Sequence, residues 1–268
     1  MDFRTDTVES GGVRTDFAVF GHGPAHLVII PGMSLHSVID SAGSVASAFS
    51  CLADDYTVWL LERRRDVPEG LSVAEMASDA AAAMGSLGIG RADIYGASQG
   101  GMIALELALR HPGLVRRLVL ASTITRQCAR SIEVMGRWEA LSLAGDPEKL
   151  NRDVFSRVYS PGFYNRFERA FHVLEKDGTP EEMKRFAVLA RATATFDIHD
   201  ELAASVRAGR QYEAMVCGAS DDTVLGSEGI SDLSGLFGCK PLVYEGTGHA
   251  VYDEDSDFPK KMMSFLLA

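Results

Sequence analysis

Short apolar runs recur along the chain, and the segments between them have the residue pattern of helices. Several of the runs are continuously apolar, as is typical of central strands that are covered on both faces. The predicted strands are Phe17–Phe20, Leu27–Ile30, Thr57–Leu61, Ala92–Tyr95, Leu118–Ala121, Glu213–Cys217 and Leu242–Tyr244. The alternation of such strands with helices predicts an α/β protein with a mostly parallel central sheet flanked by helices.

The clearest helix signal follows the strand Thr57–Leu61. Ser72 and Glu75 have the spacing of a capping box, and Gly88 stands where a helix would end. A capping box satisfies free N–H groups at a helix start, and glycine is favoured just after a helix end. This pattern predicts a helix over Val73–Leu87.

The alternation of strands and helices stops between Ile124 and Ser205. This segment looks helical, contains no convincing strand and carries many aromatic residues. We predict that residues 124–205 form a helical cap over the carboxyl edge of the sheet, inserted into a core domain of residues 1–123 and 206–268. The alternative is that the segment only continues the helical layer. The cap residues expected to contact substrate are Trp138, Phe163 and Tyr164.

Composition limits the classes of partner. At 268 residues the chain is long enough for one large domain with a sizeable core. Its formal net charge of −11 disfavours binding to nucleic acid or to an anionic membrane surface. No secretory signal is visible, and no apolar run is long enough to span a membrane. We therefore expect a cytoplasmic monomer or homodimer that acts on a small molecule.

The cysteines give no sign of a metal site or a disulfide framework. They are scattered, without the paired spacing of zinc ligands. The four positions are Cys51, Cys128, Cys217 and Cys239. We expect neither a metal nor a cofactor.

One pentapeptide carries the strongest chemical signal. Gly96–Gly100 reads G-x-S-x-G, with Ser98 at its centre, between a predicted strand and an apolar helix. A sharp strand-to-helix turn exposes a serine hydroxyl beside a base and beside donors for an oxyanion, and its tight backbone requires small neighbours. Ser98 is therefore the predicted nucleophile.

A serine nucleophile needs a base and an orienting carboxylate. His249 is the best-placed histidine, because it follows the last strand in a glycine-rich loop, at the edge where open parallel sheets place their sites. Asp221 and Asp222 follow the strand Glu213–Cys217 at the same edge. The residue pattern leaves both aspartates open.

Two backbone N–H groups are expected to stabilise the oxyanion. Gln99 follows the nucleophile at a helix start, where the helix dipole adds a favourable field. Met33 follows the strand Leu27–Ile30 in a Pro-Gly turn. Both donors would be main-chain groups.

Together these motifs resemble the α/β-hydrolase fold superfamily, in its cap-containing serine hydrolases, along nearly the whole chain. The matching segments are Gly96–Met102 for the nucleophile turn, His111–Leu120 for the following helix-to-strand passage, Gly218–Asp221 for the acid loop, Gly248–His249 for the histidine loop and Tyr252–Phe265 for the terminal segment. The resemblance implies the order nucleophile, acid, histidine, and its G-x-x-D acid loop favours Asp221 over Asp222.

The chain departs from the family pattern at two loops. Pro31-Gly32 stands where the family has His-Gly, and Glu62–Arg65 replaces its Arg-Gly-x-Gly. Arg63, Arg64 and Arg65 form either a solvated surface run or a site for an anionic substrate.

The resemblance implies a serine hydrolase that cleaves a small carboxylic ester, lactone or thioester through an acyl-enzyme. The same residues serve acyl transfer, C–C or amide cleavage and perhydrolysis elsewhere in the superfamily, because a fold does not set a substrate. A different class, a ligand-binding or signalling protein with slow turnover, is the second alternative.

Overall fold

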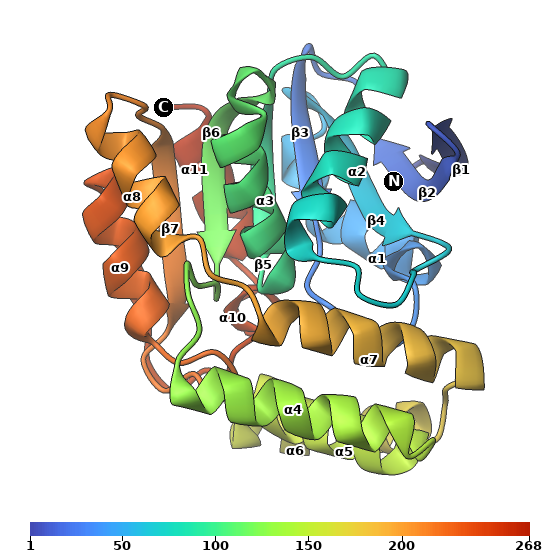
Figure 1. The fold of residues 1–268 in the computed structure, drawn as a ribbon. Helices are drawn as coiled ribbons and strands as arrows, with labels where there is room; N and C mark the ends of the chain where they lie inside the picture. The colour runs from blue at the N-terminus through green and yellow to red at the C-terminus, as the bar shows by residue number, and fades with distance from the viewer.

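An eight-stranded sheet runs through the centre of the protein in the computed structural model, which describes residues 1–268 (Figure 1). The strands are β1 (Phe3–Ser10), β2 (Val13–Phe20), β3 (Ala25–Ile30), β4 (Tyr56–Arg64), β5 (Ala92–Ala97), β6 (Val115–Ala121), β7 (Glu213–Ala219) and β8 (Leu242–Tyr244). Their order across the sheet is β1-β2-β4-β3-β5-β6-β7-β8. The six neighbouring strands β4, β3, β5, β6, β7 and β8 pair in parallel. Strand β1 pairs antiparallel with β2, and β2 pairs antiparallel with β4. The predicted fold class is confirmed.

Strand β1 is the element that the sequence pattern missed. It is largely exposed, so polar residues alternate through it without an apolar run. Gly11 and Gly12, both at positive φ, form the tight turn that pairs β1 with β2. A Gly-Gly pair between two alternating segments is a hairpin signal that was available in the sequence.

Helices cover both faces of the sheet and one of its edges (Figure 1). They are α1 (Ala42–Ala48), α2 (Val73–Ser86), α3 (Gln99–Arg110), α4 (Ala129–Leu143), α5 (Pro147–Val158), α6 (Pro161–Leu174), α7 (Pro180–Ala194), α8 (His199–Arg207), α9 (Glu228–Phe237), α10 (Val251–Glu254) and α11 (Phe258–Leu266). Short 3₁₀ turns occupy Val38–Ser41, Ser50–Leu52 and Pro112–Leu114.

Two hydrophobic cores lie on opposite faces of the sheet. The larger includes side chains of α2, α3, α8 and α9, and the smaller includes side chains of α1, α10 and α11. Every residue of β5 is buried, and its one charged residue, Asp93, pairs with Arg116. The capping box at Ser72 and Glu75 forms as expected, and α2 ends at Ser86.

Helices α4 to α7 form a separate layer across the carboxyl edge of the parallel strands (Figure 1). Within this α4–α7 layer, α7 lies nearest to the sheet and packs on α4. The expected insertion of residues 124–205 also contains most of α8, which instead lies beside α9 against the sheet. The layer over the edge therefore ends with α7, at Ala194.

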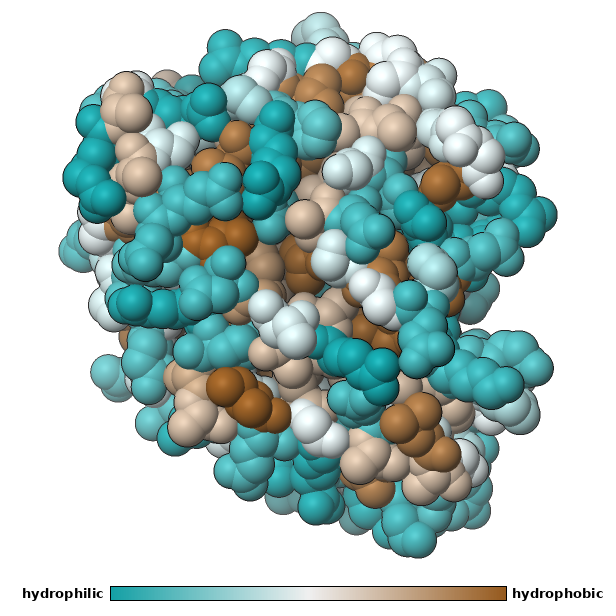
Figure 2. Space-filling model, viewed as in Figure 1, coloured by the Kyte–Doolittle hydropathy of each residue, from teal (hydrophilic) through white to brown (hydrophobic).

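The surface offers no large continuous apolar area in the view of Figure 2. Polar residues dominate this face, and apolar residues form separated patches. No helix of the chain is both long enough and apolar enough to cross a membrane.

Candidate active site

Ser98 sits in a strained turn between β5 and α3. Its backbone has φ 53° and ψ −122°, a conformation that few residues other than glycine adopt. The turn is tight enough to require glycine on both sides of it. A β-carbon at Gly96 would lie 2.4 Å from the Gly100 carbonyl oxygen, and one at Gly100 would lie 2.0 Å from the Ile30 carbonyl oxygen. The G-x-S-x-G pattern is thus a consequence of backbone packing.

His249 lies directly against Ser98. Its Nε2 is 2.9 Å from Ser98 Oγ, and the residue is only 2% exposed. The loop after β8 places it there, and the Ser122 hydroxyl holds that loop by donating a hydrogen bond to the His249 carbonyl. The structure thus brings together the serine and the histidine that the sequence singled out.

The carboxylate beside His249 belongs to Asp222, which corrects the expectation of Asp221. Asp222 Oδ2 is 2.7 Å from His249 Nδ1. Its other oxygen, Oδ1, accepts hydrogen bonds from the N–H groups of Val224 (2.8 Å) and Leu225 (3.0 Å). Aspartate commonly binds the backbone two residues ahead in such a turn, and here that bond fixes the carboxylate toward the histidine.

Asp221 points elsewhere. It is exposed and lines a polar surface cleft of about 570 Å³ together with Arg130 and Arg157. Strand β7 extends to Ala219, two residues beyond the predicted end at Cys217. The chain then turns inward one residue later than the G-x-x-D spacing implies.

Ser98, His249 and Asp222 form one buried chain of hydrogen bonds. Donation from Nδ1–H to the Asp222 carboxylate leaves Nε2 of His249 as an acceptor for the Ser98 hydroxyl. This is the arrangement in which a histidine can remove the proton of a serine during attack on a carbonyl carbon. No group of three or more His, Cys, Asp or Glu side chains is placed to hold a metal ion.

The two expected oxyanion donors flank the serine. Gln99 is the first residue of α3, so its N–H has no acceptor within the helix. Met33 lies in the loop after β3, which we call the β3 exit loop (residues 31–37), and its N–H donates to no protein acceptor. A β-carbon at Gly32 would lie 3.3 Å from Ser98 Cβ, so this loop passes close to the nucleophile. That these groups stabilise an oxyanion stays a prediction.

The Gln99 side chain has contacts that the sequence did not suggest. It is fully buried, and its Oε1 accepts a hydrogen bond from Arg63 Nε at 2.8 Å. Its Nε2 donates to the Leu189 carbonyl (2.8 Å) and to Thr193 Oγ1 (2.7 Å), both on α7. The residue after the nucleophile therefore links the core to the α4–α7 layer.

Arg63, Arg64 and Arg65, which the sequence left as a surface run or as a site for an anionic substrate, differ in their contacts. Arg63 is only 5% exposed, and burial lowers the pKa of its guanidinium to about 10. Arg64 pairs with Asp79 at 2.5 Å, and Arg65 pairs with Asp16 at 2.7 Å. Each guanidinium has a protein carboxylate, so none is free for an anionic substrate.

Tyr252 is a further residue near the site that the sequence left unassigned. Its hydroxyl would lie 3.6 Å from a β-carbon at Gly32, beside the nucleophile, and it makes no hydrogen bond to the protein. Burial and the carboxylates of Asp253 and Asp222 raise the pKa of Tyr252 well above its ordinary value. The hydroxyl therefore stays protonated at neutral pH and can donate a hydrogen bond.

The three aromatic residues expected to contact substrate lie within the α4–α7 layer. Trp138 is 2% exposed, packs against Phe186 and donates from Nε1 to Asp153 Oδ2 at 3.0 Å. Its contacts are those of an interior residue rather than an entrance residue. Phe163 stacks on Tyr159.

Tyr164 is likewise engaged inside the layer. Its ring stacks on Phe171, and its hydroxyl donates to Glu175 Oε1 at 2.7 Å. None of these ring contacts or hydrogen bonds includes Ser98, Asp222 or His249. A role in substrate binding stays a prediction for Trp138, Phe163 and Tyr164.

Comparisons with known proteins agree with this architecture. Residues 25–256 match the family described as alpha/beta hydrolase fold. A protein of Rhizobium rhizogenes named "Putative carbamate hydrolase RutD" is 25% identical over 248 residues, which cover 87% of this chain and 92% of that protein. A protein of the same name from Serratia proteamaculans is 41% identical over 71 residues, but the match spans only 25% of this chain and 27% of that protein.

A solved structure gives the same fold at low identity. The enol-lactonase of Burkholderia xenovorans superimposes with a TM-score of 0.82 at 19% identity, over 98% of this chain and 100% of that one. At this identity the likeness concerns the fold alone.

Proposed function

Because the chain belongs to the alpha/beta hydrolase fold family, we propose that it is a serine hydrolase that cleaves a small carboxylic ester, lactone or thioester through an acyl-enzyme. Hydrolytic chemistry is supported by the family and by the names of its relatives. The observation that carries the finer proposal is the buried hydrogen-bond chain from Ser98 through His249 to Asp222.

Ser98, His249 and Asp222 act as nucleophile, proton carrier and orienting carboxylate in the proposed reaction. Ser98 Oγ attacks the carbonyl carbon while His249 Nε2 takes the hydroxyl proton, and Asp222 stabilises the imidazolium that forms. The Met33 and Gln99 N–H groups hold the negative oxygen of the tetrahedral intermediate. The proton on His249 passes to the leaving oxygen or sulfur, and the acyl group remains on Ser98.

Water completes the cycle by the same steps in reverse order. His249 takes a proton from a water molecule, whose oxygen attacks the acyl carbon. The second tetrahedral intermediate collapses to release a carboxylic acid, and the proton returns to Ser98 Oγ. One water molecule is consumed for each bond cleaved, and no cofactor takes part in any step.

The surroundings of Ser98 favour small and uncharged substrates. Ser98 is 9% exposed and its neighbour Gln99 is bonded to α7, so the α4–α7 layer lies close above the nucleophile. The nearby guanidinium of Arg63 is fully occupied by protein acceptors. A substrate carboxylate would therefore find no free cation there.

Carbamates are a second candidate substrate class, and the names of the relatives favour them. A carbamate carries nitrogen on the carbonyl carbon, which makes that carbon a weaker electrophile than in an ester. The same nucleophile, base and oxyanion donors would serve, so the two classes differ in rate rather than in mechanism.

A substrate panel tests the proposal and ranks the classes. We would measure kcat/KM for 4-nitrophenyl esters of graded acyl length, an uncharged lactone, a thioester and a 4-nitrophenyl carbamate, with Ser98→Ala as control. We expect turnover of short esters or lactones that is abolished in Ser98→Ala. The serine hydrolase proposal would be contradicted if turnover survived in Ser98→Ala, or if the wild type turned over none of these compounds.

A further inference from the structure

Side chains from outside the β3 exit loop hold its main chain at two points and hold the first residue after the loop at a third. The loop carries Met33, and no regular secondary structure stabilises it until the 3₁₀ turn that begins at Val38. The three hydrogen bonds run from Arg63 Nη2 to the Pro31 carbonyl (2.8 Å), from Arg185 Nη1 to the Ser34 carbonyl (3.4 Å) and from the Val38 N–H to Glu62 Oε2 (2.8 Å).

These three side chains also bind one another. Glu62 Oε1 accepts from Arg185 Nη2 at 2.9 Å and lies 3.4 Å from Arg63 Nη1. All three side chains are at most 16% exposed. Burial raises the pKa of Glu62, but Arg185 and Arg63 hold it below the ordinary value, so the carboxylate is ionised between two cations.

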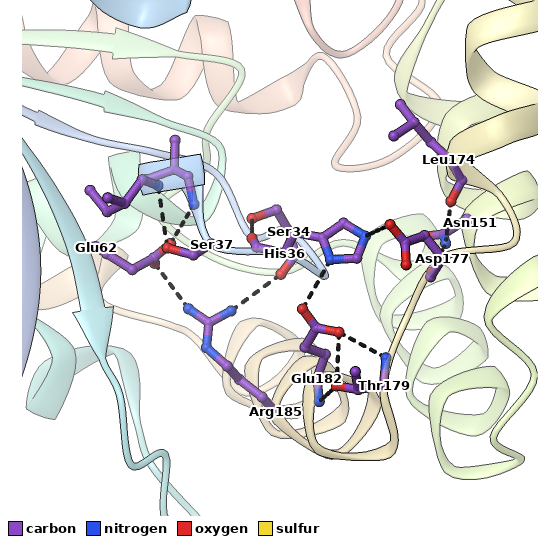
Figure 3. Close-up of polar contacts among 12 residues, drawn as sticks. Ser34, His36, Ser37, Glu62, Asn151, Leu174, Asp177, Thr179, Glu182 and Arg185 are labelled. Carbon is purple, nitrogen blue, oxygen red and sulfur yellow. Dashed lines mark hydrogen bonds and ion pairs between the residues drawn. The ribbon is translucent and has the colours of Figure 1, made fainter. Parts of the chain in front are cut away.

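Arg185 is the member of this cluster that comes from α7. Figure 3 shows it extending from the helix to Glu62 on one side and to the Ser34 carbonyl on the other. In the same view His36 of the loop lies beside Glu182, with Nδ1 2.9 Å from Oε1. The β3 exit loop is therefore attached to α7 as well as to the core.

The same helix holds the other side of the oxyanion site. Leu189 and Thr193 of α7 accept hydrogen bonds from the Gln99 side chain, and Arg63 donates to both Gln99 Oε1 and the Pro31 carbonyl. Both expected oxyanion donors thus belong to segments that α7 binds.

We propose that Arg185 is a positioning residue, which holds the β3 exit loop in its catalytic shape only while α7 is seated on the core. The proposal rests on the serine hydrolase function given above. Oxyanion donors must be fixed before the reaction, because a donor that has to reorganise loses much of its effect. Docking of the α4–α7 layer and assembly of the oxyanion site are then one event.

A substrate-binding role for Arg185 fits the contacts less well. Its two terminal nitrogens are already engaged, by Glu62 and by the Ser34 carbonyl. A purely structural role would also need these bonds, so the test must separate folding from the geometry of the oxyanion site.

Arg185→Gln and Arg191→Gln form a matched pair for this test. Arg191 lies on the same helix but is 46% exposed and pairs with Glu139 and Glu69, away from the β3 exit loop. For each variant we would measure kcat and KM on 4-nitrophenyl acetate, the inhibition constant of phenylboronic acid, and Tm. The boronate adduct of a serine places an oxygen where the oxyanion forms, so its affinity reports on the donors.

We expect Arg185→Gln to lower kcat by roughly 10- to 100-fold with little change in KM, since loss of a whole oxyanion donor costs about 10²–10³-fold. Boronate inhibition should weaken by a similar factor. Arg191→Gln should match the wild type in both readouts. Arg185→Lys should recover part of the loss, because it keeps the charge beside Glu62.

The double variant Glu62→Gln/Arg185→Gln tests whether the cluster acts as a unit. We expect its kcat to be no lower than that of the poorer single variant, because coupled residues do not contribute additively. A lowered Tm with unchanged kcat and boronate affinity in Arg185→Gln would overturn the proposal and leave Arg185 a structural role.

Two controls keep the conclusions separate. If Arg185→Gln fails to fold, Arg185→Lys decides, and wild-type kcat in that folded variant would overturn the proposal. If the wild type neither turns over esters nor reacts at Ser98, the serine hydrolase function itself fails. Wild-type turnover with unaffected variants would contradict only the role of Arg185.

Discussion

The carboxylate of Asp222 lies 2.7 Å from Nδ1 of His249, while the adjacent Asp221 faces solvent. Asp222 is 2% exposed and is held by two backbone N–H groups through its other oxygen. A carboxylate so fixed selects the histidine tautomer that accepts a proton from Ser98. The two neighbouring aspartates, alike in sequence, therefore have different environments and should have different effects on activity.

Substitution of the two aspartates tests this difference. We expect Asp222→Asn to lower kcat by about 10³–10⁴-fold, because the amide favours the wrong tautomer of His249. Asp221→Asn, the matched control, should stay within about threefold of the wild type. Steady-state kinetics on a short 4-nitrophenyl ester provides the measurement, and the reverse ranking would return the orienting role to Asp221.

The side chain of Gln99 should affect activity, although the expected oxyanion donor is its backbone N–H. Gln99→Ala removes the acceptor of Arg63 Nε and the amide that donates to the Leu189 carbonyl and to Thr193 Oγ1 of α7. Each buried polar group left unpaired costs about 1–3 kcal/mol. We therefore expect both a lower Tm and a reduced kcat. Gln127→Ala is the control, since Gln127 also donates to α7, at the Thr193 carbonyl, but does not contact Arg63.

For this control we expect a lower Tm with kcat close to that of the wild type. If Gln99→Ala behaves in the same way, its side chain supports only the fold. Thermal unfolding and ester kinetics on both variants decide between the two results.

The ion pairs of Glu62 predict a pH-dependent contribution to stability. The folded protein holds the pKa of Glu62 below the ordinary 4.5, so unfolding takes up a proton in the acid range. The stabilisation is complete above pH 4.5 and is lost as the pH falls through the folded pKa. The Tm difference between wild type and Glu62→Gln should thus be largest near pH 7 and narrow below pH 4.5.

Glu245→Gln serves as the control for this titration, because Glu245 is exposed and has no ion-pair partner. Its Tm should follow that of the wild type at every pH. A Tm difference for Glu62→Gln that stays constant from pH 7 to pH 3.5 would show that Glu62 contributes no ionised contact.

The main contribution of Trp138 should be to the stability of the folded protein. Its side chain extends from α4, is buried and packs on Phe186 of α7, and truncation of such an aromatic side chain costs about 3–5 kcal/mol. We expect Trp138→Ala to lower the free energy of unfolding by that amount in urea titrations. Phe167→Ala, at a residue that is 40% exposed, should cost roughly 1 kcal/mol or less. Equal effects would contradict the interior position of Trp138.

Much of the fold could be predicted because several of the buried strands carry continuous apolar runs. The exposed strand β1 has no such run, so its only signal was the Gly11-Gly12 turn. The position of Ser98 followed from the glycines that its strained turn requires. The Gly11-Gly12 turn and the Ser98 turn both depend on local backbone geometry, and the glycines that such turns require are visible in a single sequence.

The contacts around the site depend on tertiary packing instead. A shift of one residue in the turn after β7 decides between Asp221 and Asp222, and no local pattern fixes that turn. Arg63 looks like a member of a surface run, because Arg64 and Arg65 follow it. Its burial arises from the distant residues Gln99 and Arg185, which only the folded chain brings beside Glu62 and the β3 exit loop.

The reactivity of Ser98 tests the central claim most directly. Reaction with a fluorophosphonate followed by peptide mapping should place one phosphonate on Ser98, with loss of esterase activity in proportion to labelling. Ser98→Ala should take up no label and lose about 10⁴–10⁶-fold in kcat. Labelling of another serine such as Ser122, or an unlabelled Ser98 in an enzyme that still hydrolyses esters, would contradict the account.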